Sequence, residues 1–161
     1  MIVAHDIYSE TNPAFCAYAL VAFVNAYISI SAEAPEVPTV YLALPVALSS
    51  DLEETFKGTN KKTSLLEWLE RSPQVQIGLA ERLNASLGIV SEAIRFACFT
   101  RVLTLDEFGR LGLGDLKLKK NAVKALSEKP ARVIKRAERL GYWFATVRST
   151  RSVFDIVGLT V

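Results

Sequence analysis

The sequence predicts a mainly α-helical domain with a small β-sheet, built around a buried helix near the N-terminus. The first observation is NPAFCAYALVAFVNAYISI (12–30): no charged side chain occurs from Pro13 to Ser31, although 22% of the chain is charged. Apolar residues then recur at helical spacing, and the spacing becomes alternating after Arg101. With 161 residues and 50% hydrophobic composition, we expect one core and a single domain over 1–161.

The apolar helix has a well-marked start, because Asn12 can cap the first turn and Pro13 suits the first helical position. A helix that is apolar on every face lies in a packed core or in a bilayer, where about 20 residues span the hydrocarbon. Asn25 and Ser29 make its second half polar, and no Lys or Arg precedes Lys57 to set an orientation. We therefore expect a core helix and, since no cationic signal-peptide region occurs, a cytoplasmic protein without membrane contact.

The segment after this helix predicts a connector and then a short strand. Pro35 and Pro38 are typical of a connector. From Thr39 to Leu44, Val and Leu alternate with their neighbours, and β-branched and aromatic side chains suit a pleated strand. This run therefore predicts a strand that Pro45 ends.

Two capping boxes predict the next helices. SDLE (50–53) opens a short helix that Gly58 ends, and SLLE (64–67) opens a second one. In both, a serine accepts a hydrogen bond from the first turn and a glutamate three residues later reaches back.

The middle of the chain predicts two helices separated by a glycine. Ser72-Pro73 opens the first helix, and Gly88 breaks the run. From Ile89 to Phe99 the helical spacing resumes. A β-hairpin follows, because apolar residues alternate in 103–105 and again in 111–113, with a turn between them at Phe108-Gly109.

The C-terminal third is basic and predicts two more helices. Lys117 to Ser127 is either a loop or a frayed helix, Pro130 opens a helix that runs to about Phe144, and Ser149 or Thr150 caps a last short helix. The order helix, strand, several helices and hairpin is that of a winged helix, in which an early strand and a late hairpin form a three-stranded sheet.

A winged helix invites a DNA-binding interpretation, which the residues disfavour. The helix that would read bases offers only Arg95 and Arg101 as long donors, whereas base readout needs several such side chains. The hairpin tip carries Asp106 and Glu107, which phosphates would repel. A protein-interaction module fits better, and a stand-alone winged-helix DNA-binding regulator stays the alternative.

Charge is distributed unevenly beneath a formal net charge of +2. Residues 117–151 hold eleven Lys or Arg against two Glu, a balance of +9, and the other positions hold eight basic and fifteen acidic residues, a balance of −7. The basic segment 117–151 therefore favours polyanions or an acidic protein face.

The strongest candidate surface lies on the helix after Pro130. At about 100° per residue its cations share one side, and an aromatic residue follows them. We call Arg132, Lys135, Arg136, Arg139 and Trp143 the basic stripe. It predicts a contact for phosphates or for an acidic partner; the other interpretation is a solvated face with Trp143 tucked under arginine stems.

Enzyme motifs are absent from the sequence. It contains no phosphate-binding loop, nucleophile elbow or metal-ligand cluster, so we expect no catalytic residue, no metal and no cofactor. A weak third candidate is a metal-dependent nuclease built from Asp106, Asp115 and Lys117. Cys16 and Cys98 fall in apolar helical patterns and are expected to be core residues in a reducing compartment.

Short motifs over almost the whole chain resemble one family. The pieces are HDIYSETNPAFCAYAL (5–20), LPVAL (44–48), TSLLEWLE (63–70), IGLAERLN (77–84), EAIRFAC (92–98) and RAERLGYWFATVRSTRSVFDIVGL (136–159). In these pieces the chain resembles the middle component of prokaryotic three-component ABC systems, a group that includes Lamassu-type defence operons.

This resemblance implies a non-enzymatic adaptor in an antiphage or anti-plasmid defence complex. The adaptor would link an ABC ATPase related to SMC and Rad50 proteins to an effector, often a nuclease, with DNA contacted within the complex. The family pattern supplies no catalytic residue to carry over.

Overall fold

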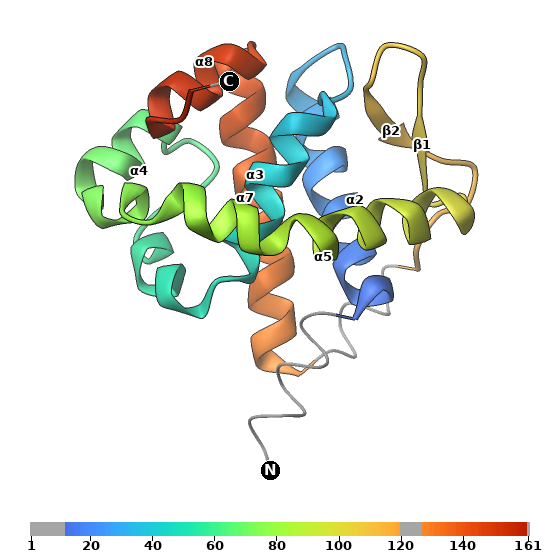
Figure 1. Cartoon of the computed structure of the whole chain (residues 1–161), viewed down its shortest axis with the longest axis horizontal. Coiled ribbons are helices and arrows are strands. Elements are labelled where there is room, and N and C mark those ends of the chain that lie inside the picture. The colour runs from blue at the N-terminus through green and yellow to red at the C-terminus, as the bar shows by residue number, and fades with distance from the viewer. Residues whose placement is uncertain (1–11, 120–126, 161) are drawn as a thin grey trace.

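The structure is a computed structural model, and it describes residues 12–119 and 127–160. In chain order the elements are α2 (Pro13–Ile30), α3 (Val37–Leu48), the 3-10 helix η1 (Ser50–Phe56), α4 (Leu65–Arg71), the 3-10 helix η2 (Pro73–Gln76), α5 (Leu79–Phe99), β1 (Leu103–Leu105), β2 (Leu111–Leu113), α7 (Glu128–Val147) and α8 (Thr150–Val157) (Figure 1). The prediction of a mainly helical fold with a small β-sheet is confirmed.

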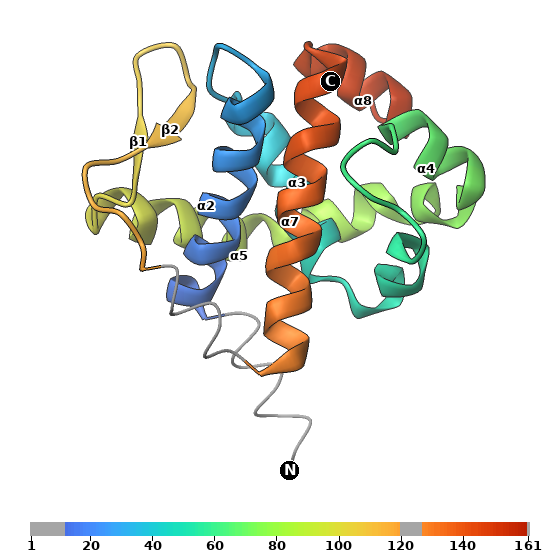
Figure 2. The same cartoon turned by 180° about the vertical axis from the view of Figure 1, so that it is seen from behind.

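Helices α2 and α7 stand side by side in the middle of the molecule, and α5 crosses them (Figures 1 and 2). Gly141 of α7 allows this close approach, because a Cβ there would overlap the carbonyl oxygen of Phe23 and lie 2.9 Å from Cβ of Ala26. Three residues further on, the ring of Phe144 meets Phe23 edge-on at 5.7 Å between centroids. The core is thus organised around the α2–α7 contact.

Helix α2 begins as predicted, with Asn12 Oδ1 accepting a 2.8 Å hydrogen bond from the amide of Ala14 and Pro13 in the first position. Among the described residues, it is the one helix long and apolar enough to cross a membrane. It packs against α7, α5 and α3, and its buried residues are Cys16, Ala17, Ala19, Leu20, Phe23, Val24, Ala26 and Tyr27. Small alanines among these residues let neighbouring helices come close.

The predicted strand at Thr39–Leu44 is wrong, because this run lies inside α3. Alternation was misleading here: Ala43 is as buried as Leu42 and Leu44, so the segment is enclosed on nearly all sides. Such a run does not distinguish a strand from a buried helix. Pro45 does not end the segment either, and α3 continues through it to Leu48.

Two further predictions need correction: the capping box at Ser50 and the helix break at Gly88. The predicted short helix is present as a 3-10 helix, but its N-cap is Ser49, whose side chain makes no capping bond, so the capping box predicted at Ser50 is absent. Gly88 does not break a helix, since α5 runs continuously from Leu79 to Phe99. The N-cap at Ser64 is confirmed, with Ser64 Oγ accepting a 3.0 Å bond from the amide of Glu67, whereas the Glu67 carboxylate pairs with Arg71.

The hairpin is confirmed, and β1 pairs antiparallel with β2 in the register Leu103 with Leu113 and Leu105 with Leu111. The third strand of the predicted sheet is reduced to a single bridge between Glu36 and Arg110, just before α3. The arrangement is compatible with a winged-helix-like domain. That the chain forms one domain over 1–161 stays a prediction.

The C-terminal helices lie close to their predicted positions. Helix α7 begins at Glu128, two residues before Pro130, and α8 is capped by Ser149 Oγ, which accepts a 3.2 Å bond from the amide of Ser152. Of the predicted loop or frayed helix at 117–127, residues 117–119 have no regular structure and 120–126 lie outside the described residues.

Candidate interaction surfaces

The basic stripe lies on α7, but most of it faces the chain itself. Arg136 is only 6% exposed, and its Nε donates a 2.9 Å bond to the carbonyl of Ala47. Arg132 forms ion pairs with Glu53 and, at 2.9 Å, with Glu128. Arg136 is therefore turned toward the chain's own backbone and not toward solvent.

The remaining cations of the stripe differ in their environment. Arg139 donates to the carbonyl of Phe56 at 3.2 Å and to Thr59 Oγ1 at 3.0 Å. Burial lowers the pKa of Arg139 from its usual range, and the nearby carboxylate of Glu138 partly offsets that shift. Lys135 is exposed to solvent.

Trp143 belongs to an aromatic cluster that includes Phe56 and Trp68. It is 1% exposed, it stacks on Phe56 at 5.8 Å between centroids with an interplanar angle of 4°, and its Nε1 donates a 3.0 Å bond to the carbonyl of Asn60. Trp143 is thus buried among the chain's own rings. That the stripe contacts a partner or a phosphate stays a prediction.

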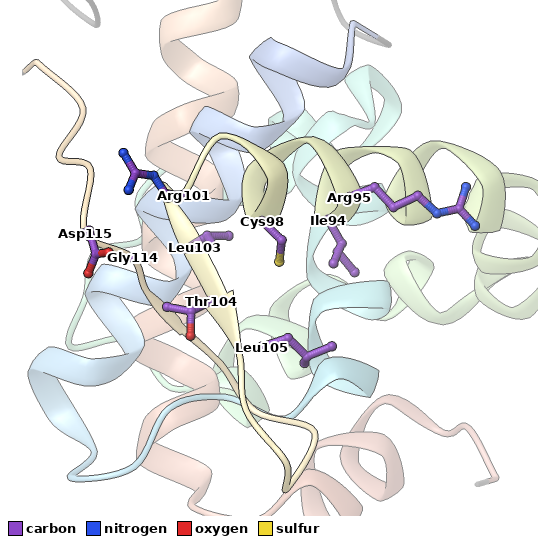
Figure 3. Close-up of a pocket in the computed structure, with 9 residues that line it drawn as sticks. All are labelled: Ile94, Arg95, Cys98, Arg101, Leu103, Thr104, Leu105, Gly114 and Asp115. Carbon is purple, nitrogen blue, oxygen red and sulfur yellow. The ribbon is translucent and has the colours of Figure 1, made fainter.

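A second surface is a cleft of about 450 Å³ between the C-terminal turns of α5 and strand β1 (Figure 3). We call it the α5–β1 cleft. Ile94, Cys98 and Leu105 project to the same side of β1 in Figure 3 and give the cleft an apolar interior. It is lined by Ile94, Arg95, Cys98, Arg101, Leu103, Thr104, Leu105, Gly114 and Asp115.

Exposed apolar residues gather in this part of the chain. Phe99, the last residue of α5, is 89% exposed, and Leu105, Leu113 and Leu116 are also exposed. A single exposed apolar side chain is ordinary, whereas several in neighbouring segments are typical of an interaction surface. The α5–β1 cleft was not predicted from the sequence. One signal was present, because Phe99 lies off the helical stripe formed by Ile89, Ala93 and Phe96.

Arg101 connects α5 to β1 in a left-handed backbone conformation, with φ of 63°. Its carbonyl oxygen accepts a 3.0 Å bond from the amide of Leu116. Gly114 lies so close to Arg101 that any side chain at 114 would overlap its carbonyl oxygen. The residues after β2 therefore fix the backbone of Arg101, which is one of the residues that line the cleft.

A third cleft, of about 680 Å³, is polar and lies at the corner between α7 and α8. Arg148 and Arg151 line it together with the hydroxyls of Ser149 and Thr150 and the carboxylate of Asp155. Arg148 is also left-handed, with φ of 72°, and it ends α7.

The nuclease candidate is not supported by the hairpin register. Asp106 pairs across the turn with Arg110, whereas Asp115 lies beside Arg101 at the other end of the hairpin. A rise of about 3.3 Å per residue separates the two residues by roughly 16 Å along the hairpin. Residues 12–119 and 127–160 hold no cluster of three or more metal-ligating side chains.

The two cysteines are not activated nucleophiles. Burial raises the pKa of the Cys16 thiol to about 11 and also raises the pKa of Cys98, so both thiols are protonated at neutral pH. Cys16 is buried as predicted, whereas Cys98 is only partly buried and lines the α5–β1 cleft.

Comparison with protein families gives a match, over residues 2–161, to the family described as ABC-three component (ABC-3C) system Middle Component 3. The chain belongs to this family. The same comparison of the chain with curated proteins and with solved structures gives no match. As a middle component, the chain is a part of a system with further components, and its surfaces are candidates for contacts with them.

Proposed function

We propose that this middle component is a non-enzymatic adaptor that links the other components of its ABC-three component system. The observation that carries the proposal is the family match, which extends over nearly the whole chain. The α5–β1 cleft and the exposed Phe99 support it, because they provide an apolar surface of the kind that protein partners cover.

The finer proposal is a Lamassu-type defence complex in the cytoplasm. In it the adaptor joins an ABC ATPase related to SMC and Rad50 proteins to an effector, often a nuclease, that acts against phage or plasmids. The motif resemblance from 5–20 to 136–159 is what supports this proposal.

Co-expression with the products of neighbouring genes, followed by size-exclusion chromatography, tests the adaptor role. We expect the chain to elute with a long ATPase and an effector in one complex of fixed stoichiometry. Elution of the chain on its own, whatever its neighbours, would refute the adaptor.

Contact with DNA or with an acidic protein through the basic stripe is a separate proposal. Lys135 is its exposed member, whereas Arg132, Arg136 and Arg139 would have to give up internal partners. If the stripe follows a DNA backbone, Lys135→Glu should reduce the salt slope of DNA binding by about 0.9 per lost phosphate contact. If it meets an acidic protein, the same variant should release a subunit at unchanged DNA affinity.

A further inference from the structure

We propose that the α5–β1 cleft docks an extended segment of a partner component that carries both apolar and acidic residues. This inference rests on the adaptor function proposed above, and it specifies the surface used and the chemistry of the occupant.

The interior of the cleft suits apolar side chains. Ile94 and Cys98 are partly buried under the cleft, and Leu105 overhangs it at 53% exposure (Figure 3). A volume of about 450 Å³ falls within the range of roughly 300–1,000 Å³ seen for ligand pockets. One or two apolar side chains of a partner can therefore be buried here.

The backbone of β1 favours an extended occupant. The amide of Asp106 donates to the carbonyl of Arg110, and the amide of Gly114 donates to the carbonyl of Val102. In an antiparallel ladder, hydrogen-bonded and non-bonded pairs alternate. Leu105 is therefore in a non-bonded pair, and its N–H and C=O point away from β2.

The edges of the two strands differ in coverage. On its outer side β2 is covered by the connector before α3, with 2.8 Å from the amide of Leu111 to the carbonyl of Pro35. Within the described ranges no such segment covers β1. The backbone N–H and C=O of Leu103 also point away from β2, but Leu103 is only 1% exposed. The accessible part of the β1 edge is therefore at Leu105. A partner strand can add main-chain hydrogen bonds there.

Charge defines the second requirement on the occupant. Arg101 is exposed and, in the part of the chain that the structure describes, has no ion pair. Lys117 and Lys119 follow the cleft residue Asp115 and are exposed as well. Arg95 is the exception, since it pairs with Glu92 at 2.6 Å. At the other end of β1, Asp106 and Glu107 follow Leu105 and are exposed. The cations therefore favour carboxylates on the part of the incoming segment that lies near Arg101.

The conformation of Arg101 strengthens this assignment. A left-handed residue directly after a helix is usually glycine, because other side chains are strained there. An arginine held in this conformation by the close approach of Gly114 places its guanidinium at the rim of the cleft, on the side away from Cys98 (Figure 3), at a cost in backbone energy. We infer that this guanidinium meets the partner's carboxylate.

A second copy of this chain fits the cleft less well than a tethered segment. β1 is three residues long, and only its Leu105 end is open. Such an edge supplies little of the roughly 1,200 Å² that a stable pair of proteins buries. A segment tethered within a larger complex gains instead from its high effective concentration.

The first test compares Arg101→Gly with Arg148→Gly in the co-expressed complex. Both variants remove a charge and relieve a left-handed arginine, and Arg148 lines the polar cleft beside α8 and not the α5–β1 cleft. We expect both to raise the melting temperature of the isolated chain, whereas only Arg101→Gly weakens the complex. The expected loss is about tenfold in affinity, that of one charge-assisted hydrogen bond. Equal affinities of the two variants would overturn the inference.

The second test is hydrogen exchange at single amides, which does not depend on any substitution. The amide of Leu105 should exchange fast in the isolated chain and become protected in the complex, whereas that of Thr104, paired with Gly112, should be protected in both. A complex in which Leu105 stays unprotected overturns this inference and leaves the adaptor standing. Failure to form any complex overturns both. Protection that grows with the concentration of the isolated chain overturns it in favour of a second copy.

Discussion

The aromatic cluster around Trp143 and the hairpin end around Phe99 use the same kinds of side chain in opposite ways. In the cluster, both tryptophans donate their indole N–H to the backbone, Trp68 to the carbonyl of Thr55 at 3.1 Å and Trp143 to that of Asn60 at 3.0 Å. At the hairpin end Phe99 is almost fully exposed, and Leu105 overhangs a cleft. In the first region the polar groups are hydrogen-bonded within the chain and the rings are buried, which stabilises the fold. In the second region apolar side chains stay exposed to solvent in the folded chain.

The largest expected effect is at Trp143. Trp143→Ala empties a site between Phe56 and Trp68 and removes one of the two donors to the Asn60 carbonyl, so we expect a loss of about 3–5 kcal/mol in unfolding free energy. Urea unfolding followed by circular dichroism measures it. Trp143→Phe keeps most of the ring contact and should cost clearly less. A loss below about 1 kcal/mol for the alanine variant would contradict a structural role for the cluster.

The next effect is expected at Gly141, where α2 and α7 touch. A methyl group there overlaps the Phe23 carbonyl, and because that oxygen is backbone the two helices must separate. We expect Gly141→Ala to destabilise the protein by about 1–3 kcal/mol, as overpacking does. Thermal and urea unfolding both report it, and unchanged stability would show that the helices are further apart than described.

Gly88→Ala is the matched control for Gly141→Ala, because both glycines lie inside α-helices. We expect the control to change the unfolding free energy in the opposite direction. Nothing stands within 4 Å of a Cβ built at Gly88. Alanine has the better helix propensity, so Gly88→Ala should stabilise the protein by about 0.5–1 kcal/mol. A decrease in the urea midpoint would mean that α5 does not continue through Gly88.

The smallest effect on stability is expected at Phe99. Because this ring is almost entirely in solvent, Phe99→Ala should change the unfolding free energy by less than about 0.5 kcal/mol. The contrast with Trp143→Ala measures the difference between the two regions. A large loss at Phe99 would place it in the folded core instead.

The sequence was sufficient where a local signal determines the structure. The caps at Asn12 and Ser149 and the hairpin were predicted because side-chain hydrogen bonds and alternation act over a few residues. Helix α3 was not predicted because it is buried on nearly all sides. Its sequence therefore lacks the hydrophobic periodicity that distinguishes a helix from a strand.

The candidate surfaces were harder to predict than the fold. The apolar face of α7 is visible in the sequence, but the internal partners of Arg136 and Arg139 are Ala47 and Phe56, more than 80 residues away. The α5–β1 cleft likewise depends on how the hairpin sits over α5, which spacing within either segment does not encode. Long-range contacts therefore decide which charged and apolar residues remain free for a partner.

The most direct test of the claim that the hairpin end does the docking compares Phe99→Asp with Ile77→Asp in co-purification with the other components. Both residues are strongly exposed, Phe99 directly after the cleft residue Cys98 and Ile77, at 77%, between η2 and α5, so neither change should unfold the chain. We predict that Phe99→Asp keeps the melting temperature of the isolated chain but no longer co-elutes with its partners, whereas Ile77→Asp retains both properties. Retention of the full complex by Phe99→Asp, or equal loss in both variants, would contradict it.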